Sequence, residues 1–158
     1  MEGAIYSSTV GSVEYIRFVG VIRYSQCAGL ESYINHIFES PTFSGLAVDL
    51  EQAEMLDSTA LGLLARLSIE FKKISSDKPT IFIRTGELAH ILKRVCFDQV
   101  FNIVSRPENN EGIEYVELAS VIQDEKQVLK SVVEAHKSLA QISDENKNYF
   151  TDITNAIK

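Results

Sequence analysis

The stretch LAVDLEQAEMLDSTALGLL, residues 46–64, decides the fold. It opens on a near-continuous apolar run, 46–50, which is typical of a strand covered on both faces. After a short acidic connection, apolar residues recur every three or four positions, as on one face of a helix. These positions are Leu61, Leu64, Leu67 and Phe71. We therefore expect a buried strand followed by a helix over about residues 58–74.

Ser58 lies at the junction between the expected strand and the expected helix. Asp57 and Ser58 are both residue types that cap a helix N-terminus. Free backbone N–H groups and the helix dipole favour negative charge at that end. A phosphate on Ser58 can therefore be accommodated there without refolding the domain. Taken from the residues alone, a plain N-cap is the simpler interpretation of Ser58.

The motif MLDSTALGLL, residues 55–64, resembles the signature of STAS domains, the fold of bacterial anti-sigma-factor antagonists. That signature runs apolar, Asp, Ser, Ser or Thr, Gly, apolar, Gly, then apolar residues. This chain departs from it at Ala60, where the first Gly is common. The resemblance extends over residues 3–104 through the order of the expected elements. It implies that Ser58 is a phospho-acceptor, with Thr59 as a second candidate.

The resemblance also implies a phosphorylation-switched binding module. The unphosphorylated surface would bind an anti-sigma factor, usually one that is also a Ser/Thr kinase, and a PP2C-type phosphatase would reverse the phosphorylation. The expected partner-binding residues are Asp57, Ser58, Thr59, Ala60, Leu61 and Gly62. Two alternatives stay open, namely a scaffold subunit of a larger signalling complex and a small-ligand-sensing module.

Composition narrows the class of protein. The 158 residues suit one domain, with or without an appendage. A net charge of −7 disfavours nucleic acid and anionic membranes as partners, so a protein partner is expected. No apolar run approaches 18 residues, so we expect no transmembrane helix, and we expect no signal peptide, because the first residues lack a basic region and an apolar core. Cys27 and Cys96 fit free thiols in a reducing cytoplasm, where we expect the protein to act.

No enzyme motif accompanies Ser58. A nucleophilic serine needs a base and an orienting acid, but no histidine lies beside a triad-like motif. The histidines are His36, His90 and His136. Four acidic residues near the expected strand end suggest a magnesium site, although a solvated loop is the simpler interpretation; they are Asp49, Glu51, Glu54 and Asp57. We therefore expect no catalytic residue, no metal and no cofactor.

The rest of the N-terminal part predicts an α/β domain with a mixed sheet of four to five strands and helices packed on it. A hairpin opens it, and helices then alternate with strands. The expected strands are 4–10, 13–21, 46–50, 80–84 and 101–104, and the expected helices are 27–39, 58–74 and 87–95.

The C-terminal part predicts a helical extension. We divide the chain into a STAS-like domain, 1–104, a linker, 105–120, and the extension, 121–158. A short β-like piece, 113–117, is either an edge strand or extended linker. A heptad-like seam then runs through Val128, Val132, Ala135, Leu139, Ile142, Asn146, Tyr149, Ile153 and Ala156. This pattern fits one long helix or two with a bend at 142–145. The segment either packs on its own domain or associates through the seam with a partner or with a second copy as a homodimer.

Overall fold

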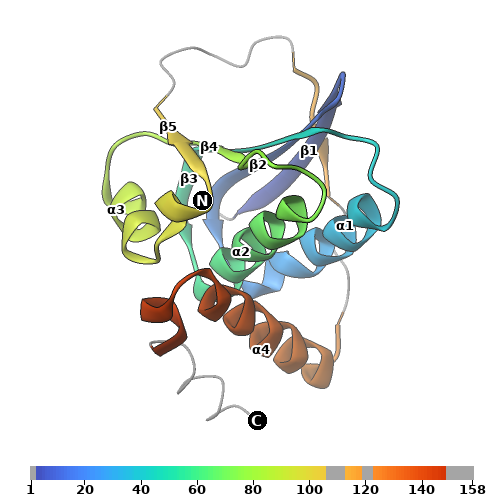
Figure 1. Ribbon diagram of the computed structural model, residues 1–158. Coiled ribbons are helices and arrows are strands. Elements are labelled where there is room, and N and C mark those ends of the chain that lie inside the picture. The colour runs from blue at the N-terminus through green and yellow to red at the C-terminus, as the bar shows by residue number, and fades with distance from the viewer. Residues whose placement is uncertain (1–2, 106–112, 119–122, 149–158) are drawn as a thin grey trace.

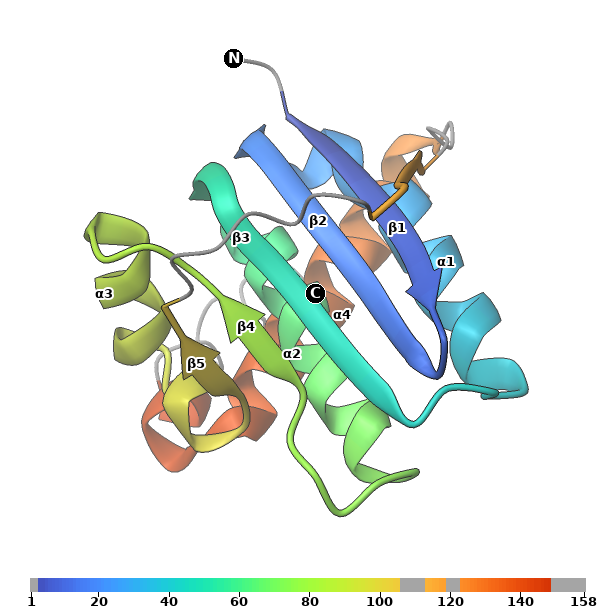
Figure 2. The ribbon, with the colours of Figure 1, turned by 90° about the horizontal axis from the view of Figure 1, so that it is seen from above.

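A six-stranded mixed sheet carries the helices on one of its faces (Figures 1 and 2). The computed structural model describes residues 3–105, 113–118 and 123–148, and the account below concerns these residues. The strand order is β5-β4-β3-β2-β1-β6. The α/β class that the sequence predicts is therefore confirmed. The described part of the chain has one strand more than the four to five expected.

The predicted hairpin is confirmed. β1 (Ala4–Val10) pairs antiparallel with β2 (Val13–Ile22) across a turn in which Gly11 has a φ of 60°. That left-handed conformation is readily adopted by glycine. Every second residue of β2 is buried, because one side of the strand faces the helices.

The strand β3 (Gly45–Leu56) is longer than the predicted strand 46–50, and the prediction of a short acidic connection after it is wrong. β3 runs parallel to β2 and stays paired with it as far as the pair Ile22–Leu56, past two register shifts. The second half of β3 is largely exposed and carries acidic residues, so it lacks the apolar run by which a strand is usually found.

The acidic residues on β3 therefore belong to a strand and not to a solvated loop. Asp49 is only 2% exposed, and its carboxylate accepts a hydrogen bond from Arg17 Nε at 3.1 Å. The guanidinium group of Arg17 also lies 4.1 Å from the ring centre of Tyr115. Asp49 thus has a structural partner across the sheet.

Two long helices cover the helical face of the sheet. A short 3-10 turn, η1 (Tyr24–Gln26), leads into α1 (Cys27–Glu39), and α2 (Ser58–Lys72) follows β3. Both helices match the predicted positions closely. The largest fully buried side chains of the core are Phe18, Phe71, Phe97, Phe101, Ile16, Ile22, Leu30, Ile34, Leu50, Leu64, Leu67 and Ile81.

The remaining strands extend the sheet at both edges. β4 and β5 run parallel to β3, as crossover connections through helices require. β6 pairs antiparallel with β1, so the β-like piece near residue 113 includes an edge strand. The bounds are β4 (Thr80–Phe82), α3 (Glu87–Arg94), η2 (Phe97–Gln99), β5 (Asn102–Val104) and β6 (Val116–Glu117).

The helix α4 (Glu125–Ile142) forms a third layer beneath α1 and α2 (Figure 1). The next residue, Ser143, has an extended backbone, and a further helical turn follows at residues 144–148. The Ser143 hydroxyl accepts a hydrogen bond from the Asn146 N–H at 3.1 Å. Of the two alternatives for the extension, its described part therefore has the bend at 142–145 and not one continuous helix. The seam residues Tyr149, Ile153 and Ala156 lie outside the described residues.

Candidate functional site

Asp57 fixes the start of α2. One oxygen of its carboxylate accepts from the Ala60 N–H at 2.9 Å, which caps the helix. The other oxygen accepts from the Tyr24 N–H at 2.7 Å, which ties the cap to the segment after β2. The Asp57 N–H in turn donates to the Ile22 carbonyl at 3.0 Å. This carboxylate therefore holds the N-terminus of α2 in one place.

Ser58 is the first residue of α2, and its side chain reaches the surface. It is exposed, whereas among the six predicted partner-binding residues Asp57 is half-buried and the other four are buried. The buried motif residues are Thr59, Ala60, Leu61 and Gly62. The structure thus brings the six predicted partner-binding residues to the start of one helix, but it leaves only Ser58 among them exposed.

The structure places His136 of α4 against Ser58. The Ser58 Oγ and the His136 Nε2 lie 2.8 Å apart, although the two residues are 78 positions apart in the chain. His136 is 5% exposed. Burial lowers the pKa of its imidazole, and the Asp57 carboxylate opposes that shift. The imidazole therefore favours its neutral form, in which one ring nitrogen can accept a hydrogen bond.

The helices α2 and α4 approach closely beside this pair. A Cβ atom added to Gly62 would lie 2.3 Å from the Ala135 carbonyl oxygen and 2.5 Å from the Ala135 Cβ. No side chain at position 62 fits this distance, so the close approach depends on glycine. Gly62, the glycine of the motif, is therefore one point where the C-terminal extension packs on the domain.

Sequence reasoning missed His136, Ala135 and Tyr24 as members of this site. The apolar seam contained Ala135, and the motif contained Gly62, so small residues on both helices were a signal for close packing. Nothing local links positions so distant in the chain. No histidine lies near Ser58 in the sequence, but in the folded chain His136 lies beside it.

The Ser58 hydroxyl and the His136 imidazole form a nucleophile-and-base pair in geometry alone. A hydrolytic triad also needs an acid that orients the imidazole. The Asp57 carboxylate serves as the helix cap, since both of its oxygens accept backbone N–H bonds. The arrangement also presents a hydroxyl at a helix N-terminus, where a phosphate is favoured.

Other kinds of site were sought in the described ranges 3–105, 113–118 and 123–148. In them, no group of three or more His, Cys, Asp or Glu side chains could hold a metal ion. Within the same ranges, no helix is long and apolar enough to span a bilayer. Cys27 and Cys96 are free and buried, which agrees with the predicted thiols. Burial raises the pKa of the Cys27 thiol, which keeps it protonated.

Comparisons with known proteins identify the fold. No protein-family model matches the chain, and no curated protein matches its sequence. Among solved structures, an anti-sigma factor antagonist from Mycobacterium paratuberculosis matches with a TM-score of 0.53 and 20% identity, over 67% of this chain and 88% of that one. The anti-sigma factor antagonist SpoIIAA in its unphosphorylated form matches with a TM-score of 0.47 and 13% identity, over 59% and 98%.

The mycobacterial match shows that this chain has the fold of STAS-domain anti-sigma factor antagonists, as the motif at residues 55–64 predicts. The match leaves about a third of the chain without a counterpart.

Proposed function

We propose that the chain is an anti-sigma-factor antagonist whose binding is switched by phosphorylation of Ser58. One observation carries the proposal: within the Asp57–Gly62 motif, Ser58 alone is exposed, at the capped N-terminus of α2. The fold supports the same role, because the mycobacterial protein with this fold is an anti-sigma factor antagonist. The partner is then an anti-sigma factor, which by resemblance is also a Ser/Thr kinase.

A phosphate on Ser58 would change the charge of the surface more than its shape. It adds a charge of about −1.5 to −2 beside the Asp57 carboxylate. The exposed Glu54 lies on the same strand end and adds to the negative charge. Free N–H groups of the first turn stabilise the phosphate, so α2 stays folded. An acidic or apolar partner face is then repelled, and a PP2C-type phosphatase restores binding.

Burial separates the two candidate acceptors. Thr59 is 4% exposed, and a kinase needs to enclose the hydroxyl to which it transfers phosphate. Ser58 is exposed, and its hydroxyl becomes available once the contact with His136 Nε2 at 2.8 Å opens, whereas Thr59 is buried. We therefore assign the switch to Ser58.

Capture of the partner tests the proposal. Full-length chains with Ser58→Ala or Ser58→Asp serve as baits in lysate of the cells that make this protein, with quantitative mass spectrometry as the readout. We expect the Ser58→Ala bait to retain an anti-sigma factor at least about tenfold more strongly, which corresponds to about 1.4 kcal/mol.

The matched control is Ser76→Asp, which adds the same charge at an exposed serine in the loop after α2. It should retain the partner as the unmodified chain does. Equal retention by the Ser58→Ala and Ser58→Asp baits would show that Ser58 is only a helix residue.

A further inference from the structure

We propose that the face of α2 beneath α4 is a helix-docking surface, which α4 occupies in this structure and an amphipathic helix of the partner protein occupies once α4 is displaced. The inference rests on the proposed function, because it names what the partner presents to the Ser58 surface. It also assigns a role to the C-terminal extension, which the motif at Ser58 leaves unexplained. The α2 face is defined by Ser58, Gly62, Leu63 and Arg66.

The contacts of α4 show which kind of helix the α2 face can bind. Gly62 lets a helix backbone approach closely, and Ala135 is the small residue that meets it. Leu139, one turn further along α4, is completely buried. His136 bonds to Ser58 at the edge of this contact. A competing helix therefore needs a small residue opposite Gly62 and a large apolar residue four positions later.

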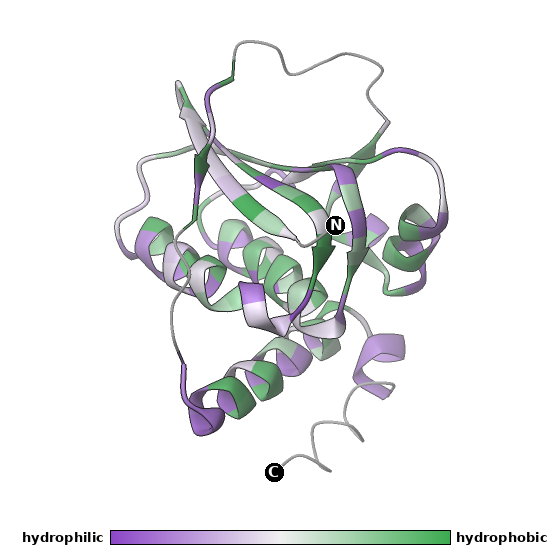
Figure 3. Ribbon diagram, turned by 180° about the vertical axis from the view of Figure 1, so that it is seen from behind, coloured by the Kyte–Doolittle hydropathy of each residue, from purple (hydrophilic) through white to green (hydrophobic). Residues whose placement is uncertain are grey.

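α4 is attached by fewer buried residues than α2. Three of its 18 residues are buried, namely Ala135, His136 and Leu139, and several more are half-buried, of which Ala140 and Ile142 pack against the core. Figure 3 shows hydrophilic and hydrophobic residues alternating along this helix. α2 by contrast buries ten of its 15 residues. A segment with few buried apolar contacts can open locally while the rest of the domain stays folded.

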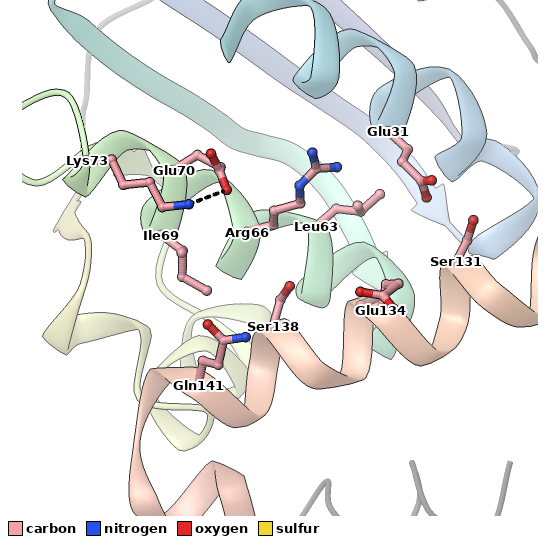
Figure 4. A pocket seen from close by; sticks show the side chains of 11 residues that line it. Glu31, Leu63, Arg66, Ile69, Glu70, Lys73, Ser131, Glu134, Ser138 and Gln141 are labelled. Carbon is pink, nitrogen blue, oxygen red and sulfur yellow. Dashed lines mark hydrogen bonds and ion pairs between the residues drawn. The ribbon is translucent and has the colours of Figure 1, made fainter. Parts of the chain in front are cut away.

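The surface against which α4 packs is also partly hydrophilic. A cavity of about 360 Å³ lies between α2 and α4 and is lined mostly by charged and polar side chains (Figure 4). Glu31, Arg66 and Glu70 line it from the inner layer, and Ser131, Ser138 and Gln141 line it from α4. Interfaces that form and separate are more polar than permanent cores. This polar composition suits a helix that can separate from α2.

A second attachment lies beyond the bend at Ser143. The Asn146 side chain is 3% exposed and donates from Nδ2 to the Val95 carbonyl at 2.6 Å, which holds the turn 144–148 against the end of α3. This contact is a hydrogen bond and not an apolar anchor. Water can replace such a partner when the segment lifts, so the net cost of breaking it is small.

The test measures α4 release without any anti-sigma factor and without phosphate, so it can fail or succeed independently of the proposed function. The probe is a fluorescein-labelled synthetic peptide of residues 123–148, titrated into the full-length chain and followed by fluorescence anisotropy. The release variant is Leu139→Asp. Its matched control is Leu129→Asp, which makes the same change at a position of α4 that is 49% exposed.

We expect the peptide to bind the Leu139→Asp chain at least about tenfold more tightly than the unmodified chain or the Leu129→Asp chain. The reason is that only the Leu139→Asp chain exposes the α2 face. Adding Gly62→Ala to Leu139→Asp should abolish this gain, since the new Cβ blocks the close approach. Equal binding to all chains, or a gain that survives Gly62→Ala, would overturn the proposal.

Hydrogen exchange of the unmodified chain gives a second result that does not depend on how Leu139→Asp folds. We expect the α4 amides to exchange through an opening that leaves β2 and β3 protected. If the α4 amides exchange only together with those strands, α4 is an integral part of the domain and the proposal is wrong.

Discussion

α2 and α4 are both amphipathic helices on the same side of the sheet, but they are held by different amounts of buried surface (Figure 1). α2 lies between the sheet and α4, with ten of 15 residues buried, whereas α4 lies outermost, with three of 18 buried. Ser58 therefore begins a helix that is part of the core. Its hydrogen-bond partner His136 belongs to a helix that covers the core from outside.

This difference separates two properties that sequence reasoning had combined in one motif. The first turn of α2 supplies a fixed hydroxyl, and the face of α2 that follows supplies the contact with another helix. We expect the two properties to respond separately to substitution, and the predictions below test this from the largest effect to the smallest.

Leucine truncation on the two helices gives the largest contrast. Leu64 of α2 is completely buried, so Leu64→Ala should lower the free energy of unfolding by about 3 kcal/mol. Leu139→Ala in α4, also from a completely buried position, should lower the unfolding free energy of the sheet much less, because α4 can leave first. Urea denaturation followed by circular dichroism measures both. Equal losses would mean that the two helices share one cooperative core.

Gly62→Ala should act on α4 and spare α2. The added Cβ lies 2.3 Å from the Ala135 carbonyl oxygen, so α4 has to shift at a cost of about 2 kcal/mol to its docking. Within α2 itself alanine is the better helix former by about 1 kcal/mol. Hydrogen exchange should therefore show faster exchange in α4 with unchanged or slower exchange in α2. Unchanged exchange in α4 would contradict the close approach of the helices.

Asp57→Ala should loosen the start of α2. Its carboxylate accepts bonds from the Ala60 and Tyr24 N–H groups, and loss of a cap costs about 1 kcal/mol. Asp57→Asn keeps the capping oxygen and should recover most of that stability. Thermal unfolding measures the difference, with Asp77→Ala at an exposed loop residue as the control. An effect no larger than that of Asp77→Ala would show that the cap is unimportant.

The smallest expected effect is a dependence of α4 docking on pH. Burial lowers the pKa of His136 in the folded chain below the ordinary value of about 6.5, so the undocked state binds the proton more tightly. Docking is therefore strongest above about pH 6.5 and weakens as the pH falls below it.

Hydrogen exchange of the α4 amides, corrected for intrinsic rates, should become faster as the pH is lowered from about 7.5 to about 5.5. His136→Gln should remove this dependence, because glutamine does not titrate. The same dependence in His136→Gln would assign it to another group.

The sequence predicted the elements whose periodicity is local. The hairpin, α1 and α2 each have a pattern of apolar residues or a capping residue within one segment, and each lies where it was expected. The bend after α4 was one of two alternatives that the sequence left open. The length of β3 was missed because its second half is paired along its edges but exposed on its surface. A strand segment that is paired but exposed has no apolar run from which it can be predicted.

The candidate site was predicted in part for the same reason. Asp57 and Ser58 stand in one motif, and the cap and the exposed hydroxyl follow from their positions at a helix start. His136 and Ala135 reach the site only through the packing of α4 on α2, which joins residues more than 70 positions apart. Small residues in both segments indicated close helix packing but did not show which helix packs on α2.

The most direct test of the Ser58 switch is peptide mass spectrometry of the full chain purified from the cells that make it, before and after treatment with a PP2C-type phosphatase. We predict a mass increase of one phosphate group on the peptide carrying Ser58, located on Ser58 and not Thr59, which the phosphatase removes. Absence of phosphate from Ser58 under every growth condition would contradict the account and leave Ser58 as the first residue of a helix.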